Sequence, residues 1–173
     1  MSKPSFHRLW ASFPDHIAYP TLKDLYTSLG GAAERNINLP GFGPNGNACA
    51  SRISVAFNDA GSPINAALAS AAGARTLGTA QGARIIYGVA DLRKYLIRLL
   101  GQPSLDTTSP FDDAFQGKKG IIAFSVNWQG ATGHIALWNG TTYREPSYDN
   151  YATYVSETHA DVKTSRSEFW EIP

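Results

Sequence analysis

The single cysteine of the chain, Cys49, is the residue with the most informative chemistry. It follows a segment rich in Gly, Pro and Asn, and it opens an apolar run in which Ile53 and Phe57 recur at four-residue intervals. We therefore expect a helix that is capped by Asn47 and runs from Ala48. Backbone N–H groups at the start of a helix carry partial positive charge, which favours a thiolate over a thiol. Cys49 is thus a candidate nucleophile, although a lone cysteine on an apolar helix face is more often a small buried hydrophobic residue.

A predicted hairpin in the C-terminal part of the chain would bring a base and an acid together. Asn139 and Gly140 stand between two alternating apolar runs, which is typical of a two-residue turn. That turn places His134 directly opposite Glu145, with their Cβ atoms about 4.5–5.5 Å apart on the same side of the sheet. The sequence leaves open an ordinary cross-strand pair without chemistry, and it leaves Asp149 and Asn139 as alternative acidic or amide partners.

Cys49, His134 and Glu145 together supply the nucleophile, the base and the orienting acid of a cysteine hydrolase. We expect the backbone N–H of Cys49 to stabilise the oxyanion of the reaction, with Asn45 and Asn47 as candidates for the second donor. Aromatic residues in or near the hairpin are candidates for lining a substrate groove, with core packing as the alternative. They are Trp128, Trp138, Tyr143, Tyr148 and Tyr151, of which Trp138 and Tyr143 are the predicted substrate contacts. The loop at residues 41–47 is predicted to shape substrate access.

The elements that must position these residues change character along the chain. Helical spacing of apolar residues predicts helices near residues 21–29 and 91–100, with Thr21 and Asp91 as caps. An Ala/Gly/Ser-rich stretch at residues 59–84 predicts a surface excursion with a weak helix. The last third of the chain favours strands, which are predicted at residues 120–128, 133–138, 141–145 and 167–173. This order predicts one α+β domain over residues 1–173, with N-terminal helices packed on a C-terminal antiparallel sheet.

Composition narrows the classes of function. The chain has 173 residues, 43% hydrophobic and 17% charged, and its formal net charge is +1. A charge so close to zero, without a run of Lys or Arg, argues against nucleic acid and against an anionic membrane surface as partners. No stretch approaches the roughly 18 apolar residues of a membrane-spanning helix, and the first residues lack the apolar core of a secretory signal. One cysteine excludes an internal disulfide and a zinc site built from cysteine pairs, and we expect no cofactor.

Three segments of the sequence match a known pattern: NACASRISVAFNDAGSPI, YGVADLRKYL and KGIIAFSVNWQGATGHIALWNG. They resemble the type VI secretion amidase effector 4 family, which belongs to the NlpC/P60-like, papain-like cysteine peptidases. The resemblance implies a papain-like fold of the NlpC/P60 type, with Cys49 as nucleophile and His134 as base. The third residue of the family is usually Asp, and the matching place here holds Glu145.

The same resemblance implies an antibacterial enzyme that cleaves peptidoglycan stem peptides between γ-D-glutamate and meso-diaminopimelate. Its partners would be the stem peptide, the type VI secretion machinery and a cognate immunity protein. The protein would be made in the cytoplasm, exported without a signal peptide, and active in the periplasm of the target bacterium. Two alternatives remain open from the residues alone: a cysteine peptidase or acyltransferase that acts on other peptides, and a non-catalytic module that binds the cell wall.

Overall fold

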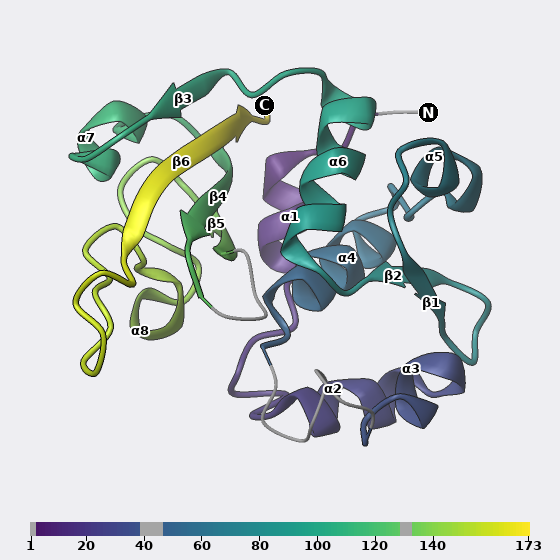
Figure 1. Ribbon diagram of the computed structural model, residues 1–173. Coiled ribbons are helices and arrows are strands. Elements are labelled where there is room, and N and C mark those ends of the chain that lie inside the picture. The colour runs from purple at the N-terminus through teal and green to yellow at the C-terminus, as the bar shows by residue number, and fades with distance from the viewer. Residues whose placement is uncertain (1–2, 39–46, 129–132) are drawn as a thin grey trace.

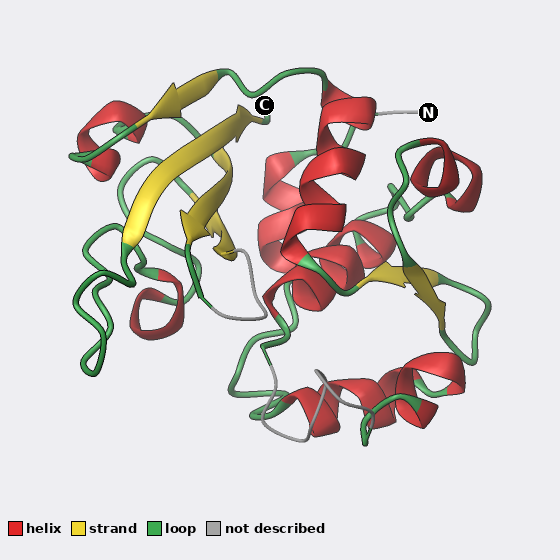
Figure 2. Ribbon diagram, viewed as in Figure 1, coloured by secondary structure: helices red, strands yellow, loops and turns green. Residues whose placement is uncertain are grey.

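The computed structural model describes residues 3–38, 47–128 and 133–173. Helices come first along the chain, short strands and further helices follow in its middle, and strands dominate the last third (Figures 1 and 2). In chain order the elements are α1 (Phe6–Ala11), α2 (Leu22–Leu29), α3 (Gly31–Arg35), α4 (Cys49–Asp59), α5 (Ala66–Ala71), β1 (Thr76–Gly78), β2 (Arg84–Ile86), α6 (Val89–Leu100), β3 (Leu105–Thr107), α7 (Phe111–Phe115), β4 (Gly120–Val126), β5 (Gly133–Trp138), α8 (Pro146–Asp149) and β6 (Thr164–Glu171).

The main sheet has four antiparallel strands in the order β3-β6-β4-β5, so β5 lies at an edge. Strand β4 pairs with β5 in a register that sets Gly120 opposite Trp138 and Ser125 opposite Gly133. It pairs on its other side with the C-terminal strand β6. The predicted strands in β4, β5 and the C-terminal segment are confirmed, and the mixed helical and antiparallel architecture confirms the predicted α+β class.

Both faces of this sheet are covered, because side chains alternate between faces along each strand. Helices α1, α4 and α6 lie beside one face, and α7 and α8 lie on the other side (Figure 1). The first face packs Ile121, Ala123, Ile135, Leu137 and Trp170 against the three helices. The second face packs Ile122, Phe124, Ala136, Trp138 and Phe169 against the two phenylalanines of α7. The apolar runs of β4 and β5 therefore reflect burial on both sides.

Helix α2 belongs to a separate apolar cluster with α3 and strand β2. Helices α2 and α3 lie at the bottom of Figure 1, below β2. The predicted cap is confirmed: Thr21 accepts the backbone N–H of Asp24, and the Asp24 carboxylate accepts the backbone N–H of Thr21. This reciprocal arrangement satisfies donors that the first turn of a helix leaves unpaired. It fixes the start of α2 directly after residues 13–20, which border the cavity that contains Cys49.

The turn after β5 differs from the prediction. A two-residue turn would set Trp138 opposite Thr141, but Trp138 instead forms an isolated bridge with Tyr143. The side-chain oxygen of Asn139 accepts the backbone N–H groups of Thr141 and of the next residue, both at 3.0 Å. These bonds stabilise a turn of four residues, because they replace the pairing that a tight turn would have formed.

The predicted strand at residues 141–145 is therefore wrong, and so is the predicted facing of His134 and Glu145. Pro146 begins helix α8 two residues after the last pairing of this hairpin, in which the Arg144 N–H donates to the carbonyl of Leu137. Proline has no N–H to donate to a strand partner and favours the first turn of a helix. The chain consequently leaves the sheet before it reaches the level of His134.

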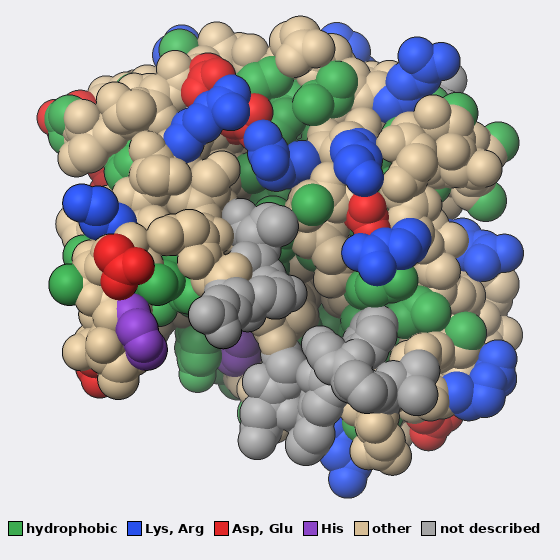
Figure 3. Space-filling model, viewed as in Figure 1, with side chains coloured by type: hydrophobic (Ala, Val, Ile, Leu, Met, Phe, Trp, Pro, Cys, Tyr) green, Lys and Arg blue, Asp and Glu red, His purple; other side chains and the backbone are tan. Residues whose placement is uncertain are grey.

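Acidic and basic side chains are interspersed on the face shown in Figure 3, and the basic ones do not gather into one patch there. Within the described ranges, no helix combines the length and the apolar character that crossing a bilayer requires.

Candidate active site

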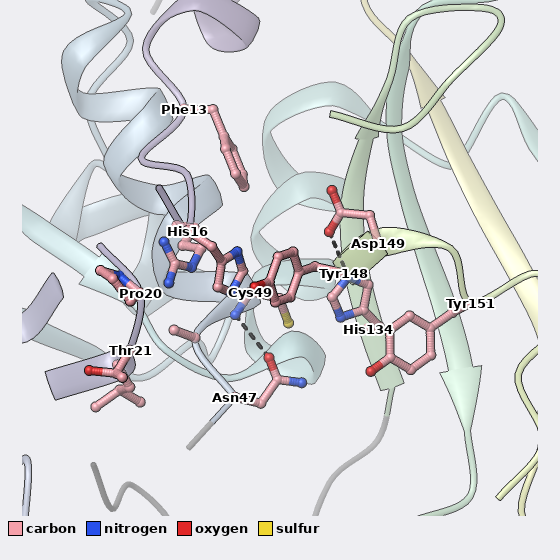
Figure 4. Close-up of a pocket in the computed structure, with 13 residues that line it drawn as sticks. Phe13, His16, Pro20, Thr21, Asn47, Cys49, His134, Tyr148, Asp149 and Tyr151 are labelled. Atoms are coloured by element: carbon pink, nitrogen blue, oxygen red, sulfur yellow. Dashed lines mark hydrogen bonds and ion pairs between the residues drawn. The ribbon is translucent and has the colours of Figure 1, made fainter. Parts of the chain in front are cut away.

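A cavity of about 230 Å³ contains the predicted nucleophile and the predicted base. Its wall comes from four parts of the chain: the segment before α2, the start of α4, the edge strand β5, and the α8 region (Figure 4). The lining residues that carry chemistry are His16, Asn47, Cys49, Arg52, His134, Tyr148, Asp149 and Tyr151. Residues distant in sequence therefore meet around one sulfur atom.

Cys49 is the first residue of α4. Its side chain is largely buried yet lines the cavity, while Ile53 and Phe57 on the same helix face pack into the core as predicted. The cap of the helix is Ala48, not Asn47 as predicted. Asn47 acts from outside the helix, because its side-chain oxygen accepts the backbone N–H of Cys49 at 3.0 Å. The N–H predicted to stabilise an oxyanion thus already has a partner.

His134 stands near the beginning of β5, directly after Gly133. A Cβ atom at Gly133 would lie 1.8 Å from the carbonyl oxygen of Phe124 on β4, so only glycine fits this close approach. The ring nitrogen Nε2 of His134 lies 3.0 Å from Oδ1 of Asp149. The ring of Tyr151 stacks on the imidazole, with centroids 4.2 Å apart and planes 16° apart. Backbone packing, a hydrogen bond and a stacked ring together fix the imidazole.

The second ring nitrogen of His134, Nδ1, is buried and has no hydrogen-bond partner at normal distance among the described residues. Figure 4 shows the sulfur of Cys49 beside this ring. Burial alone would lower the pKa of His134, but the Cys49 sulfur and the hydrogen bond with Asp149 outweigh burial and raise the pKa to about 9. The imidazole thus favours its protonated form between the Asp149 carboxylate and the Cys49 sulfur.

Asp149, and not Glu145, is the carboxylate that contacts His134. Its Oδ1 faces the imidazole, and its Oδ2 accepts the backbone N–H of Glu145 at 3.1 Å. Glu145 turns to the opposite side and pairs with His16, whose ring nitrogen Nδ1 lies 2.8 Å from Oε2. The predicted pair of His134 and Glu145 is therefore wrong. The four-residue turn and helix α8 instead bring Asp149, four residues later in the chain, to His134.

The remaining predicted site residues separate into two groups. Trp138 and Tyr143 are core residues: the indole N–H of Trp138 donates to the carbonyl of Phe115, and the hydroxyl of Tyr143 donates to Asp112. Neither lines the cavity, so their predicted substrate contacts are wrong. Asn139 serves the turn. Asn45 and most of the predicted access loop lie outside the described residues.

Of the other aromatic candidates, Tyr148 and Tyr151 line the cavity. Trp128 contacts the ring of Tyr151 edge to face, with centroids 5.5 Å apart. The indole N–H of Trp128 also donates to the hydroxyl of Tyr154. Tyr151 therefore both packs against the imidazole of His134 and lines the cavity, and Tyr148 also lines it.

Two residues of the site were missed from the sequence. Arg52 is almost fully buried in the cavity wall, three residues after Cys49, where burial lowers its pKa and the carboxylates of Glu145 and Asp149 act in the opposite direction. Its place one helical turn from Cys49 was a signal that helical spacing offers. His16 gave no comparable signal, since its partner Glu145 is 129 residues away.

Among residues 3–38, 47–128 and 133–173, no group of three or more His, Cys, Asp and Glu side chains is arranged to hold a metal ion.

A thiol at the start of a buried helix, an imidazole on an adjacent antiparallel sheet, and a carboxylate on that imidazole define the papain-like class of cysteine hydrolases. The chain belongs to the family described as type VI secretion system (T6SS), amidase effector protein 4, or Tae4, whose profile matches residues 45–170. This family consists of antibacterial peptidoglycan amidases, so the chain is a hydrolase of that class, as its sequence resemblance predicted.

Solved structures agree with this membership. Tae4 from Salmonella typhimurium, in complex with the immunity protein Tai4 from Enterobacter cloacae, is 28% identical, with a TM-score of 0.79 over 99% of this chain and 100% of that chain. Tae4 from Enterobacter cloacae in its Tae4-Tai4 complex is 27% identical, with a TM-score of 0.79 and the same coverage. Enterobacter cloacae Tae4 alone is 26% identical, with a TM-score of 0.76 over 99% and 98%. No curated protein sequence matches the chain.

Proposed function

We propose that this protein hydrolyses the amide bond between γ-D-glutamate and meso-diaminopimelate in peptidoglycan stem peptides, with Cys49 as nucleophile, His134 as base and acid, and Asp149 as the residue that orients the imidazole. The observation that carries the proposal is the cavity in which a thiol at a helix start meets an imidazole held by a buried carboxylate. Membership in an amidase effector family supplies the class of bond.

Before the substrate binds, Nδ1 of His134, which has no other partner among the described residues, takes the thiol proton of Cys49, so the reaction begins from a thiolate and an imidazolium. The thiolate attacks the γ-carbonyl carbon, so a C–S bond forms while the C–N bond breaks. The imidazolium gives its proton to the leaving amine of diaminopimelate. Water then attacks the thioester with His134 as base, which releases the glutamate carboxylate and restores the thiol.

Asp149 holds the imidazole through Nε2, so that Nδ1 is directed at the sulfur atom. The raised pKa of His134 keeps a proton available for the leaving amine at neutral pH. The developing oxyanion would take the place of the Asn47 side-chain oxygen at the backbone N–H of Cys49. Asn47 would therefore have to turn away when the substrate enters.

Delivery and protection form part of the same proposal. A wall substrate requires transport by the type VI secretion machinery into the periplasm of a target cell. The solved Tae4 structures include complexes with Tai4 immunity proteins, so a cognate immunity protein is proposed for this chain as well. Expression with a periplasmic export signal should be toxic and cytoplasmic expression tolerated; equal toxicity in both compartments would contradict a wall target.

Digestion of purified sacculi tests the proposed bond. Mass spectrometry of the released fragments should reveal new stems that end at D-glutamate and new free amines on diaminopimelate. The matched control is Cys49→Ala, which removes one sulfur atom from a site that otherwise keeps its packing. Sacculi left intact by the unmodified protein, or stems cut at a different bond, would contradict the proposal. Binding without cleavage by both proteins would indicate a cell-wall-binding module instead.

A further inference from the structure

His16 forms a second imidazole–carboxylate pair beside the Cys49 cavity. Its backbone N–H donates to Oε1 of Glu145 at 2.8 Å, and its ring nitrogen Nδ1 lies 2.8 Å from Oε2 of the same carboxylate. The ring of Tyr148 stacks on the imidazole, with centroids 3.7 Å apart and planes 3° apart. These contacts fix the orientation of a side chain that lines the cavity (Figure 4).

The segment that carries His16 is itself held in place. The buried guanidinium of Arg52 donates to the carbonyl of Pro14 at 2.6 Å and to the carbonyl of Tyr19 at 2.7 Å. These two hydrogen bonds hold the segment before and after His16. Asp15 closes a turn, because one of its oxygens accepts the backbone N–H groups of two following residues. The backbone that carries His16 is therefore held in a defined conformation at the edge of the cavity.

One stretch of chain, residues 145–151, serves both histidines of the cavity. It supplies Asp149 to His134 and Glu145 to His16, and it supplies the tyrosine ring that stacks on each imidazole. The proposed hydrolysis uses His134 but gives His16 no task. The ring nitrogen Nε2 of His16 has no hydrogen-bond partner within the described parts of the chain.

The charged groups of the wall favour an anionic ligand. His16, Arg52 and His134 are basic, and both oxygens of Asp149, the acidic residue of the described lining, are already engaged. The Nε–H of Arg52 is buried without a partner among the described residues, so one donor of this guanidinium is unsatisfied. A carboxylate at Nε2 of His16, with Glu145 at Nδ1, would satisfy both N–H groups of an imidazolium.

The other charged groups near His16 are consistent with this assignment. Asp15 and Arg144 form an ion pair on the outer side of the segment, and Arg144 also donates to the carbonyl of Trp10. The positive charge of Arg52 interacts favourably with the carboxylates of Glu145 and Asp149. The carboxylates in this region are thus paired with cations, and the side of His16 that faces the cavity is open to an incoming anion.

We infer that His16 recognises a substrate carboxylate beside the scissile amide, with Glu145 as its positioning residue. The inference rests on the proposed function, which identifies the group. Because the scissile bond uses the γ-carbonyl of D-glutamate, the α-carboxylate of the same residue stays free. His16 therefore distinguishes D-glutamate from its α-amidated form, in which a neutral carboxamide replaces that carboxylate.

Two L-Ala-γ-D-Glu-diaminopimelate tripeptides test this assignment, one with the α-carboxylate and one with the α-carboxamide. Calorimetric titration of the Cys49→Ala protein measures their binding without turnover. The carboxylate peptide should bind at least about tenfold more tightly, as expected for a hydrogen bond between charged groups. Adding His16→Gln should weaken binding of the carboxylate peptide about tenfold and leave the carboxamide peptide within about twofold, which also shows that the variant is folded. The control His7→Gln, exposed on α1, should keep the preference.

In the active protein, His16→Gln should raise KM for the carboxylate peptide with little change in kcat. Equal binding of the two peptides, or a preference that survives His16→Gln, would overturn the assignment even if both peptides are cleaved at the proposed bond. A preference that disappears in His16→Gln, in a protein that cleaves neither peptide, would support the recognition site and contradict the proposed reaction. The two failures are therefore distinguishable.

Discussion

Replacing Asp149 by Asn tests which carboxylate orients the imidazole. Asp149 is buried and makes two hydrogen bonds, one with Nε2 of His134 and one with the backbone N–H of Glu145. The amide of Asn has one acceptor oxygen, so it cannot accept both bonds, and it loses the negative charge. A hydrogen bond to a charged group contributes roughly 1.5–3 kcal/mol, which corresponds to a loss of about 10- to 150-fold in kcat/KM.

The matched variant is Glu145→Gln, which changes the carboxylate predicted from the sequence by the same chemical step. Glu145 contacts His16 and not His134, so its effect should fall mainly on KM, with kcat lowered less than about threefold. Initial rates with the carboxylate tripeptide measure both, and thermal unfolding establishes that both variants are folded. A kcat lowered more by Glu145→Gln than by Asp149→Asn would refute the assignment of Asp149.

Four further outcomes follow from the packing and charges of the site. The pKa of His134, raised to about 9, predicts that kcat/KM falls as the pH rises through about 9, because the imidazolium then loses the proton for the leaving amine. A fall in kcat/KM that begins below pH 7 as the pH is raised would contradict this. Protonated His134 stabilises the fold fully below its ordinary pKa of 6.5, and this contribution is lost as the pH rises through about 9. Between these two pH values the melting temperature should therefore fall less in His134→Gln than in the unmodified protein. Gly133→Ala should destabilise by about 3 kcal/mol and lower activity, because its Cβ would meet the backbone of Phe124; unchanged chemical denaturation would contradict that contact. Arg52→Met should lower the free energy of unfolding by about 3 kcal/mol, since two backbone carbonyls lose charge-assisted hydrogen bonds. A decrease below about 1 kcal/mol would contradict the stabilising role of these two bonds.

The parts of the site that the sequence predicted are those set by local spacing. Cys49 was placed at the start of a helix because apolar residues recur after it at helical intervals, and β4 and β5 were evident from their continuous apolar runs. The cap at Thr21 was likewise readable, since the capping residue and its partner are three residues apart. In each case the determining contacts lie within one turn or one pair of adjacent strands.

The partner of His134 was not predicted because it depends on the length of one turn. Asn139 and Gly140 are compatible with a two-residue turn, but the bonds of the Asn139 side chain stabilise a turn of four residues, and Pro146 then starts a helix. Strand β3 and helix α7 were missed for a related reason, because both are short segments inside a polar stretch and are stabilised by packing on the sheet. His16 was missed because long-range contacts alone bring it to the site.

The covalent intermediate is the most direct test of the central claim, which is that the sulfur of Cys49 attacks the stem-peptide amide. The protein should be mixed with the carboxylate tripeptide, quenched in acid during turnover, and analysed by mass spectrometry after proteolysis. We predict a mass increase equal to the L-Ala-γ-D-Glu acyl group on the peptide that contains Cys49. Cleavage of the tripeptide at an undiminished rate by Cys49→Ala would contradict the claim.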